Sequence, residues 1–356
     1  MTFYQELQLN QAGSKAVIRK SESQKEKLYH IGVYLTKIAI TMVFCFVFVA
    51  GYSMLFGNDN SVVGVVVLLC LMVFKNADFG VNAKESIGLL GLFFVILIAG
   101  PHVANQMGAF GGLGINILSL LAMMLLGCHN PLMSNQSTIV LGYLLLYGYD
   151  VTGSSYRLRV MGLVVGGIMT AIVFYRNHAH RIYKRRLKDV LAEFRMDSLR
   201  SKWQISLLLC VSVVICISEL FHLPRAMWAG IAAMSAIVPF MSDMKVRVRD
   251  RIIGNIGGGI CFLLLYFLLP PSIYAYIGII GGIGVGFSVK YGWQAVFNTF
   301  GALVIAEEAF GLKEAIQLRV FQNVFGVLFA LVFCALFHFV MEKWQEGRRE
   351  TQATAC

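Results

Sequence analysis

Two arginines stand at the start of matching apolar segments in this 356-residue chain. Arg159 begins Arg-Val-Met-Gly-Leu-Val-Val-Gly and Arg319 begins Arg-Val-Phe-Gln-Asn-Val-Phe-Gly, so both read Arg-Val-x-x-x-Val-x-Gly. An arginine can bind a carboxylate through two parallel hydrogen bonds, and a helix N-terminus adds partial positive charge. The pair predicts a binding site for an organic anion; the alternative is that both are interfacial residues whose charged ends reach water.

A second set of candidates lies in the last third of the chain. Lys290, Trp293 and Gln294 stand where one apolar segment gives way to the next, and an aromatic ring beside hydrogen-bond donors suits an aromatic acid. A belt residue at the membrane interface is the alternative for Trp293. Arg251 ends the basic run 245–251, which could gather cytoplasmic anions, but charge that only sets the topology is the favoured interpretation.

Three carboxylates are candidates for proton coupling. Glu307 and Glu308 end one apolar segment, and Asp150 follows another. Burial favours the protonated form of a carboxyl group, so a buried carboxylate can take up and release a proton. The alternative is that all three lie in solvated outer loops. His102 and His129 stand apart, lack metal-ligand spacing and are interpreted as loop histidines.

Enzymatic or cofactor chemistry is not indicated. The eight cysteines include no Cys-x-x-Cys pair, and seven of them lie in or beside apolar segments, where cysteine behaves as a small buried hydrophobic residue. The sequence contains no phosphate-binding loop, nucleophile triad or metal-ligand cluster. We therefore expect no enzyme, no cofactor and no metal.

Long apolar segments must position these residues. The chain is 58% hydrophobic and 14% charged, whereas a soluble protein is about half apolar and about a quarter charged. A membrane-spanning helix needs about 20 apolar residues. We expect an all-α, polytopic bundle of about 12 transmembrane helices, at residues 33–56, 61–75, 86–104, 110–127, 136–149, 157–176, 204–221, 226–240, 251–269, 273–288, 293–306 and 317–341.

The chain also contains an internal repeat. Residues 61–74 match 227–240 without a gap, and the two Arg-Val-x-x-x-Val-x-Gly motifs end the two halves. Six spans in each half predict two parallel repeats. The second and fifth spans of each half are short, which is typical of broken helices that line a substrate site, although ordinary helices completed by polar flanks are an equal alternative.

The distribution of charge predicts the topology. The net charge is +11, and basic residues gather near the N-terminus, between the halves and at 245–251. The positive-inside rule places these segments in the cytoplasm. We predict a cytoplasmic arm (1–30), a first repeat (31–176), a basic linker helix (177–203), a second repeat (204–341) and a cytoplasmic tail (342–356), in the inner (plasma) membrane with both termini inside. Nucleic acid is not an expected partner, because contacts with anionic lipid headgroups and the orientation of the chain in the membrane explain these charges better.

These patterns resemble the fusaric acid resistance, or aromatic acid exporter, family, and the membrane part of plant aluminium-activated malate transporters is similar. The resemblance covers about residues 30–341 and rests on the two six-span halves, the glycine-rich run after Arg251, the Arg319 motif and the Trp293-Gln294 helix start. It implies an inner-membrane exporter of organic, often aromatic, carboxylates. The chain lacks the large soluble insertion of longer members and has Glu85 where the repeat would place Arg251.

The predicted function is therefore export of organic carboxylic acids, aromatic ones among them, by proton-coupled secondary transport. A passive organic-anion channel and a non-transporting membrane scaffold are the alternatives. The expected partners are small organic anions and the lipid bilayer, and self-association into a homo-oligomer stays open.

Overall fold

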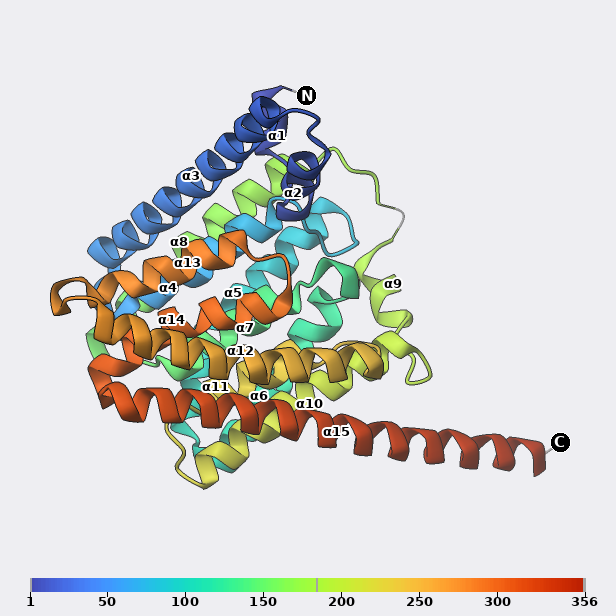
Figure 1. Ribbon diagram of the computed structural model, residues 1–356. Coiled ribbons are helices and arrows are strands. Elements are labelled where there is room, and N and C mark those ends of the chain that lie inside the picture. The colour runs from blue at the N-terminus through green and yellow to red at the C-terminus, as the bar shows by residue number, and fades with distance from the viewer. Residues whose placement is uncertain (1, 184, 355–356) are drawn as a thin grey trace. The chain divides into compact units, whose positions relative to one another are not determined.

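The computed structural model describes residues 2–183 and 185–354, and all regular structure within them is helical (Figure 1). Seven helices are long and apolar enough to cross a membrane, which agrees with a multi-pass membrane protein. These helices are α3 (Gln24–Phe56), α5 (Ala83–Gln106), α6 (Gly108–Gly127), α8 (Gly153–His178), α10 (Leu199–Leu220), α12 (Met241–Leu268) and α15 (Leu312–Thr354).

Five further helices stand at the other predicted spans. They are α4 (Ser61–Phe74), α7 (Gln136–Gly148), α11 (Ala226–Ala236), α13 (Ile277–Phe287) and α14 (Tyr291–Phe310). At about 1.5 Å per residue an eleven-residue helix such as α11 or α13 is about 16 Å long, roughly half the hydrocarbon core. Twelve crossings and two parallel repeats therefore stay a prediction. The fifth span of the second half is not short, because α14 has 20 residues.

The helices form two compact units. Unit 1 contains Met1–Phe48 and Arg249–Phe321, and unit 2 contains Val49–Val248 and Gln322–Cys356. The helices α3, α12 and α15 contribute to both. These units do not coincide with the predicted repeats, which remain a hypothesis about the sequence.

In unit 1, glycines let α14 pack closely against α12 and α13. A Cβ atom on Gly258 of α12 would meet the Val296 carbonyl oxygen at 2.7 Å, and one on Gly281 of α13 would meet the Phe297 carbonyl oxygen at 2.7 Å. Only glycine allows backbones to approach this closely. Figure 1 shows α13 and α14 running side by side, joined by residues 288–290. We call that connection the joined end of the hairpin.

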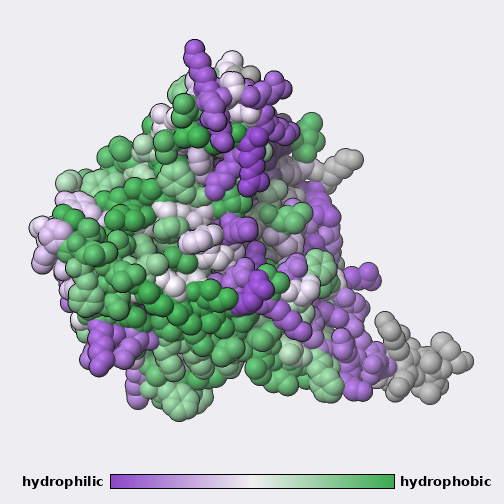
Figure 2. Space-filling view, viewed as in Figure 1, coloured by the Kyte–Doolittle hydropathy of each residue, from purple (hydrophilic) through white to green (hydrophobic). Residues whose placement is uncertain are grey.

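The last carbonyl groups of α13 have no partner within that helix, as at every helix C-terminus. Side chains from the N-terminal segment satisfy them. Gln11 Nε2 donates to Val285 O (3.4 Å), Lys15 Nζ to Phe287 O (2.6 Å), and Tyr34 Oη on α3 to Gly286 O (3.2 Å). The short helices α1 (Phe3–Leu7) and α2 (Gln11–Lys20) precede α3, and Figure 2 shows hydrophilic side chains gathered over them.

In unit 2, the basic linker is held by acidic side chains of the first half. Arg181 Nη1 lies 3.0 Å from Asp78 Oδ2, and the Leu187 backbone N–H donates to Glu85 Oε2 (2.7 Å). The helix expected over 177–203 is accordingly shorter: α9 spans Leu187–Ala192, and the segment before it is not helical where the structure describes it.

The basic run 245–251 was predicted to lie almost entirely between two spans, 226–240 and 251–269, but it lies on α12, which begins at Met241. Within unit 2, Arg247 Nη1 donates to the Ser235 carbonyl oxygen (3.2 Å), near the C-terminal end of α11. Within unit 1, Arg249 forms an ion pair with Asp250 at 3.0 Å. The cationic side chains at this end of α12 are therefore presented from a helix.

Candidate functional site: a basic aromatic pocket

A pocket of 680 Å³ opens at the joined end of the α13–α14 hairpin in unit 1. This volume lies within the range of small-molecule sites, about 300–1,000 Å³. Aromatic, cationic and small residues line it: Ala12, Lys15, Ala16, Arg19, Phe287, Ser288, Val289, Lys290, Trp293 and Phe297. We call it the basic pocket.

One wall of the basic pocket is the face of α2. Ala12, Lys15, Ala16 and Arg19 are spaced three and four residues apart, so they share one side of the helix. Asn10 caps this helix, because its Oδ1 accepts the Gly13 backbone N–H at 2.7 Å. The two alanines leave room for a ligand, while the two cations supply charge.

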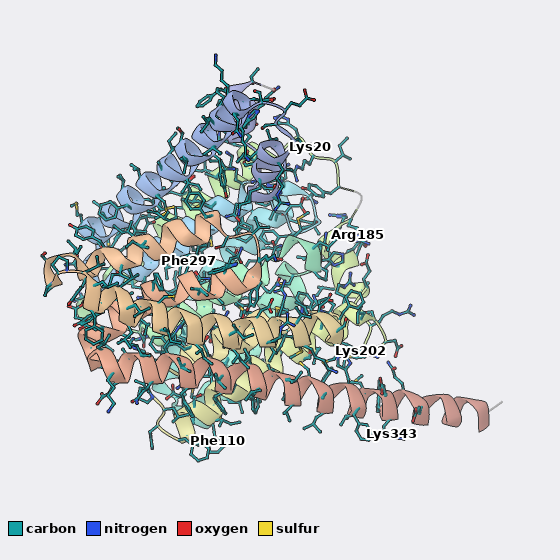
Figure 3. All side chains as sticks on the ribbon, in the orientation of Figure 1. Lys20, Phe110, Arg185, Lys202, Phe297 and Lys343 are labelled. Carbon is teal, nitrogen blue, oxygen red and sulfur yellow. The ribbon has the colours of Figure 1, made fainter. Side chains whose placement is uncertain are left out.

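The opposite wall is the first part of α14. Trp293 and Phe297 lie one turn apart with ring centroids separated by 6.3 Å, and Trp293 is 59% exposed. Phe297 lies between α13 and α14 (Figure 3), where its ring occupies the space that a Cβ atom on Gly284 would need. An open indole above a fixed phenyl ring can stack on an aromatic ligand.

In the described part of the chain, the cations of this pocket form no ion pair with a carboxylate. Within the described residues, no carboxylate lies within ion-pair distance of Lys15, Arg19 or Lys290. Three cations around an apolar interior attract an anion that also carries an apolar part. The arrangement therefore suits an aromatic carboxylate.

Two other predicted site residues support the walls. Gln294 Nε2 donates to the Ser288 carbonyl oxygen (3.1 Å), and Ser288 Oγ donates to Gly284 O (2.7 Å), which fixes the connection between the helices. Arg251 is 7% exposed and its Nη1 donates to Tyr291 Oη (3.1 Å), at the first residue of α14. Four predicted residues thus meet at one end of the hairpin, two lining the pocket and two positioning its walls.

Arg159 lies elsewhere, in unit 2, and is 2% exposed. Its Nε donates to Asn60 Oδ1 (3.1 Å), and its Nη groups donate to the carbonyl oxygens of Leu146 (3.4 Å) and Tyr149 (2.6 Å). These bonds join the start of α4, the end of α7 and α8. Such geometry favours a structural role over direct binding of an anion.

Arg319 lies on the part of α15 that belongs to unit 1 and is 5% exposed. It does not line the basic pocket. A path shared by Arg159 and Arg319 stays a prediction, because the two residues belong to different units.

A second pocket in unit 1, of 260 Å³, lies near the far end of α14. Its lining includes Glu307 and Glu308 together with Tyr266 and Tyr274. Tyr266 Oη donates to Glu307 Oε1 (3.0 Å), and the two tyrosine rings stack at 4.0 Å. We call it the acidic pocket. Two of the three predicted proton-coupling residues thus share one cavity, while Asp150 lies in unit 2.

The contribution of α2 is missing from the sequence-based set of site residues. Lys15 and Arg19 were attributed to topology, but both line the basic pocket. Their sequence does carry a signal: small residues and cations alternate on one helical face, which an arm that only sets orientation does not require. Their position beside Phe287, about 270 residues away in sequence, has no such signal.

Comparison with known families gives one match. Residues 212–333 match the family model described as fusaric acid resistance protein-like. The predicted resemblance is confirmed over this segment. The fusaric acid resistance-like segment supplies the hairpin walls of both pockets, whereas α2 lies outside it. The family is one of membrane transport proteins, and the match over this segment, together with the seven long apolar helices, suggests a protein of the membrane transporter type. No curated protein and no solved structure matches the chain.

Proposed function

We propose that this protein exports organic carboxylates, aromatic ones among them, and that the basic pocket receives them from the cytoplasm. The observation that carries this proposal is the basic pocket itself, in which Lys15, Arg19 and Lys290 surround Trp293 and Phe297. A carboxylate next to the cations and a ring against the indole would satisfy both halves of such a molecule.

The direction of export follows from charge. The helix α2 carries Lys15, Arg19 and Lys20, and the positive-inside rule favours the cytoplasm for it. Because Lys15 donates to the end of α13, the joined end of the hairpin would face the same side. The proposed membrane is the inner (plasma) membrane, with both termini cytoplasmic.

Proton coupling would operate at the other end of the hairpin. Glu307 follows Lys290 by 17 residues, which is about 25 Å along a helix at roughly 1.5 Å per residue. Ionised carboxylates repel an organic anion, and protonated ones do not. Uptake of an outside proton by Glu307 or Glu308 would therefore accompany release of the substrate.

The test is flux of a panel of aromatic acids in proteoliposomes, with and without a pH gradient. We expect accumulation of at least one acid when the gradient is present. Lys290→Gln and Trp293→Ala should reduce it, while Lys343→Gln and Trp344→Ala, which lie outside the pocket on α15, should not. Flux that only equilibrates would indicate a passive channel. No flux for any acid would contradict transport and leave the scaffold interpretation.

A further inference from the structure

A cluster of polar side chains in unit 2 is used neither by the basic pocket nor by the acidic one. It lies where the last turn of α5 meets the connection between α7 and α8. His102 of α5 approaches Asp150 of that connection, with 3.1 Å between Nδ1 and each carboxylate oxygen. The interpretation of His102 as an isolated loop histidine is therefore wrong.

The contacts of His102 define its proton. Its Nε2 lies 2.7 Å from Gln106 Nε2, and an amide nitrogen can only donate. With the Gln106 amide in this orientation, His102 Nε2 is the acceptor, and Nδ1 is the nitrogen that donates to Asp150. This neutral form satisfies both ring nitrogens and leaves one basic lone pair, at Nε2.

Asp150 is held on its other side by Arg159, whose Nη1 lies 3.7 Å from Asp150 Oδ1. The guanidinium is fixed in turn by Asn60 and two backbone carbonyls, so the carboxylate has a rigid partner. The Arg159–Asp150 pair sums to zero charge while His102 is neutral. A proton on His102 would give the cluster a net charge of +1, facing the Asp150 carboxylate directly.

The remaining surroundings of His102 are aromatic and partly open to water. Its ring stacks on Tyr156 at 3.7 Å, and Tyr156 Oη donates to the Ile98 carbonyl oxygen. His102 is 14% exposed and Asp150 is 17% exposed, so water can reach the pair. Another carboxylate, Asp59, reaches this region through Ser155, whose Oγ donates to Asp59 Oδ2 at 2.9 Å.

We propose that His102 is a proton-binding site of this protein, with Asp150 as its counter-ion and Arg159 as the residue that positions Asp150. A hydronium ion transfers its proton to His102 Nε2 and leaves a water molecule, and the N–H···N hydrogen bond from Gln106 breaks. The Gln106 amide then turns so that its oxygen accepts the new N–H. No electron transfer and no second reactant is needed.

This assignment changes the role expected for Asp150. The carboxylate faces a fixed arginine and an imidazole, so the group that gains and loses the proton is the histidine. Use of that proton to drive export rests on the proposed function, whereas the binding of the proton does not.

The proton itself is tested by nuclear magnetic resonance of isotope-labelled histidine in the full protein in nanodiscs, titrated between about pH 5 and 8, where histidine changes charge. We expect one histidine that is protonated on Nδ1 at high pH and on both nitrogens at low pH, and whose signal is missing from His102→Gln. In Asp150→Asn it should lose the Nδ1 preference, because the acceptor of the Nδ1 hydrogen is removed.

The matched control is His222→Gln, which changes a histidine in the α10–α11 connection and should leave the titration of His102 intact. A His102 signal that keeps one protonation state throughout, or that keeps its Nδ1 preference in Asp150→Asn, would overturn the proposal. If His102→Gln does not fold, His102→Asn assigns the signal instead, and the tautomer and titration of that signal in the unaltered protein decide the proposal.

Flux separates the transport role from the proton site. With one proton exchanged per substrate, a gradient of one pH unit sustains about tenfold accumulation. We expect His102→Gln to lose this accumulation and His222→Gln to keep it; accumulation that persists in His102→Gln would overturn the transport role. An unaltered protein that moves no acid would contradict the export proposal, and the titration would still establish or overturn proton binding at His102.

Discussion

The two ends of the α13–α14 hairpin have similar aromatic surfaces and opposite charge. At the joined end, Trp293 and Phe297 lie beside Lys15, Arg19 and Lys290. At the other end, Tyr266 and Tyr274 lie beside Glu307 and Glu308. Aromatic rings accept a flat apolar ligand at either end, so charge decides which end an anion prefers. Under the proposed function, this difference in charge would give the hairpin a direction for anions, which a change of protonation at the acidic pocket would modulate.

The same comparison separates two groups of cations. The linker arginines have acidic partners: Arg185 and Arg200 lie 3.0 and 3.3 Å from Glu193, and Arg186 lies 3.4 Å from Glu85. The cations of the basic pocket have no such partners within the described residues. Unpaired cations beside a cavity can bind a ligand, whereas paired ones hold the chain together.

The largest effect is expected at the acidic end. Glu307→Gln keeps the shape of the side chain and removes the ionisable carboxyl group to which the proposed function assigns proton uptake at the acidic pocket. Accumulation of an aromatic acid against its gradient should disappear, a loss of about tenfold for each pH unit applied. Binding of benzoate at the basic pocket, measured by calorimetry, should stay within about twofold, because the two pockets are separate. Accumulation equal to that of the unaltered protein would show that the acidic pocket has no role in proton coupling, and the contrast between the two ends of the hairpin would lose its functional meaning.

Removing charge at the joined end should come next. Lys15→Gln combined with Arg19→Gln takes two cations from the pocket, and we expect benzoate affinity to fall by about ten- to a hundredfold, since a hydrogen bond to a charged group contributes about 1.5–3 kcal/mol. Lys20→Gln is the matched control, because Lys20 lies on the same helix (Figure 3) and does not line the pocket. An equal loss in both variants would mean that α2 attracts anions only through its overall charge.

A smaller effect is expected for the aromatic wall. Trp293→Ala should weaken benzoate about three- to tenfold, since an aromatic pair contributes about 0.5–1.5 kcal/mol. Acetate, which has the same charge and no ring, should be affected less, and Trp293→Phe should retain most of the benzoate affinity. Competition binding of the two acids measures the ratio of the benzoate affinity to the acetate affinity. A ratio that does not change in Trp293→Ala would show that the indole does not contact the ring.

The smallest effect concerns the paired cations. Burial, with the positive charges of Arg200 and Arg185, lowers the pKa of His129. The unfolded state therefore binds the proton more readily, so docking of the linker is complete above the ordinary value of about 6.5 and weakens as pH falls through it. Hydrogen exchange of residues 185–200, corrected for the intrinsic effect of pH, should rise about a few-fold from pH 7.5 to 5.5. His129→Asn should reduce this rise in hydrogen exchange. Protection of the linker that increases as pH falls would contradict the predicted direction of the pH dependence.

Much of the fold could be predicted because it follows from local pattern. Apolar runs bounded by charge give helices near all twelve expected positions. The full length of α14 was not predicted. Spans were predicted from runs of apolar residues, and such a run ends at the polar residues of this helix although the helix continues. The length of the linker helix was overestimated for a different reason. Asp78 and Glu85 lie about 100 residues before the segment that they hold, and no local pattern reports such contacts.

The candidate site residues show the same difference between local pattern and tertiary contact. Lys290 and Trp293, which line the basic pocket, were predicted because a cation and an aromatic ring stand where one apolar segment gives way to the next. Lys15 was assigned to topology, and its contact with Phe287 crosses most of the chain. His102 and Asp150 are separated by 48 residues, and each looked isolated until α5 and the α7–α8 connection came together. Residues that meet through tertiary structure had no signal of their pairing.

The most direct measurement is the position of a heavy-atom ligand in crystals of this protein. Crystals soaked with 4-iodobenzoate should show the anomalous signal of iodine beside Trp293 and Phe297, with the carboxylate toward Lys15 and Lys290. An iodine signal in the acidic pocket, or none beside Trp293 at a concentration that saturates binding in solution, would contradict the basic pocket as the anion site.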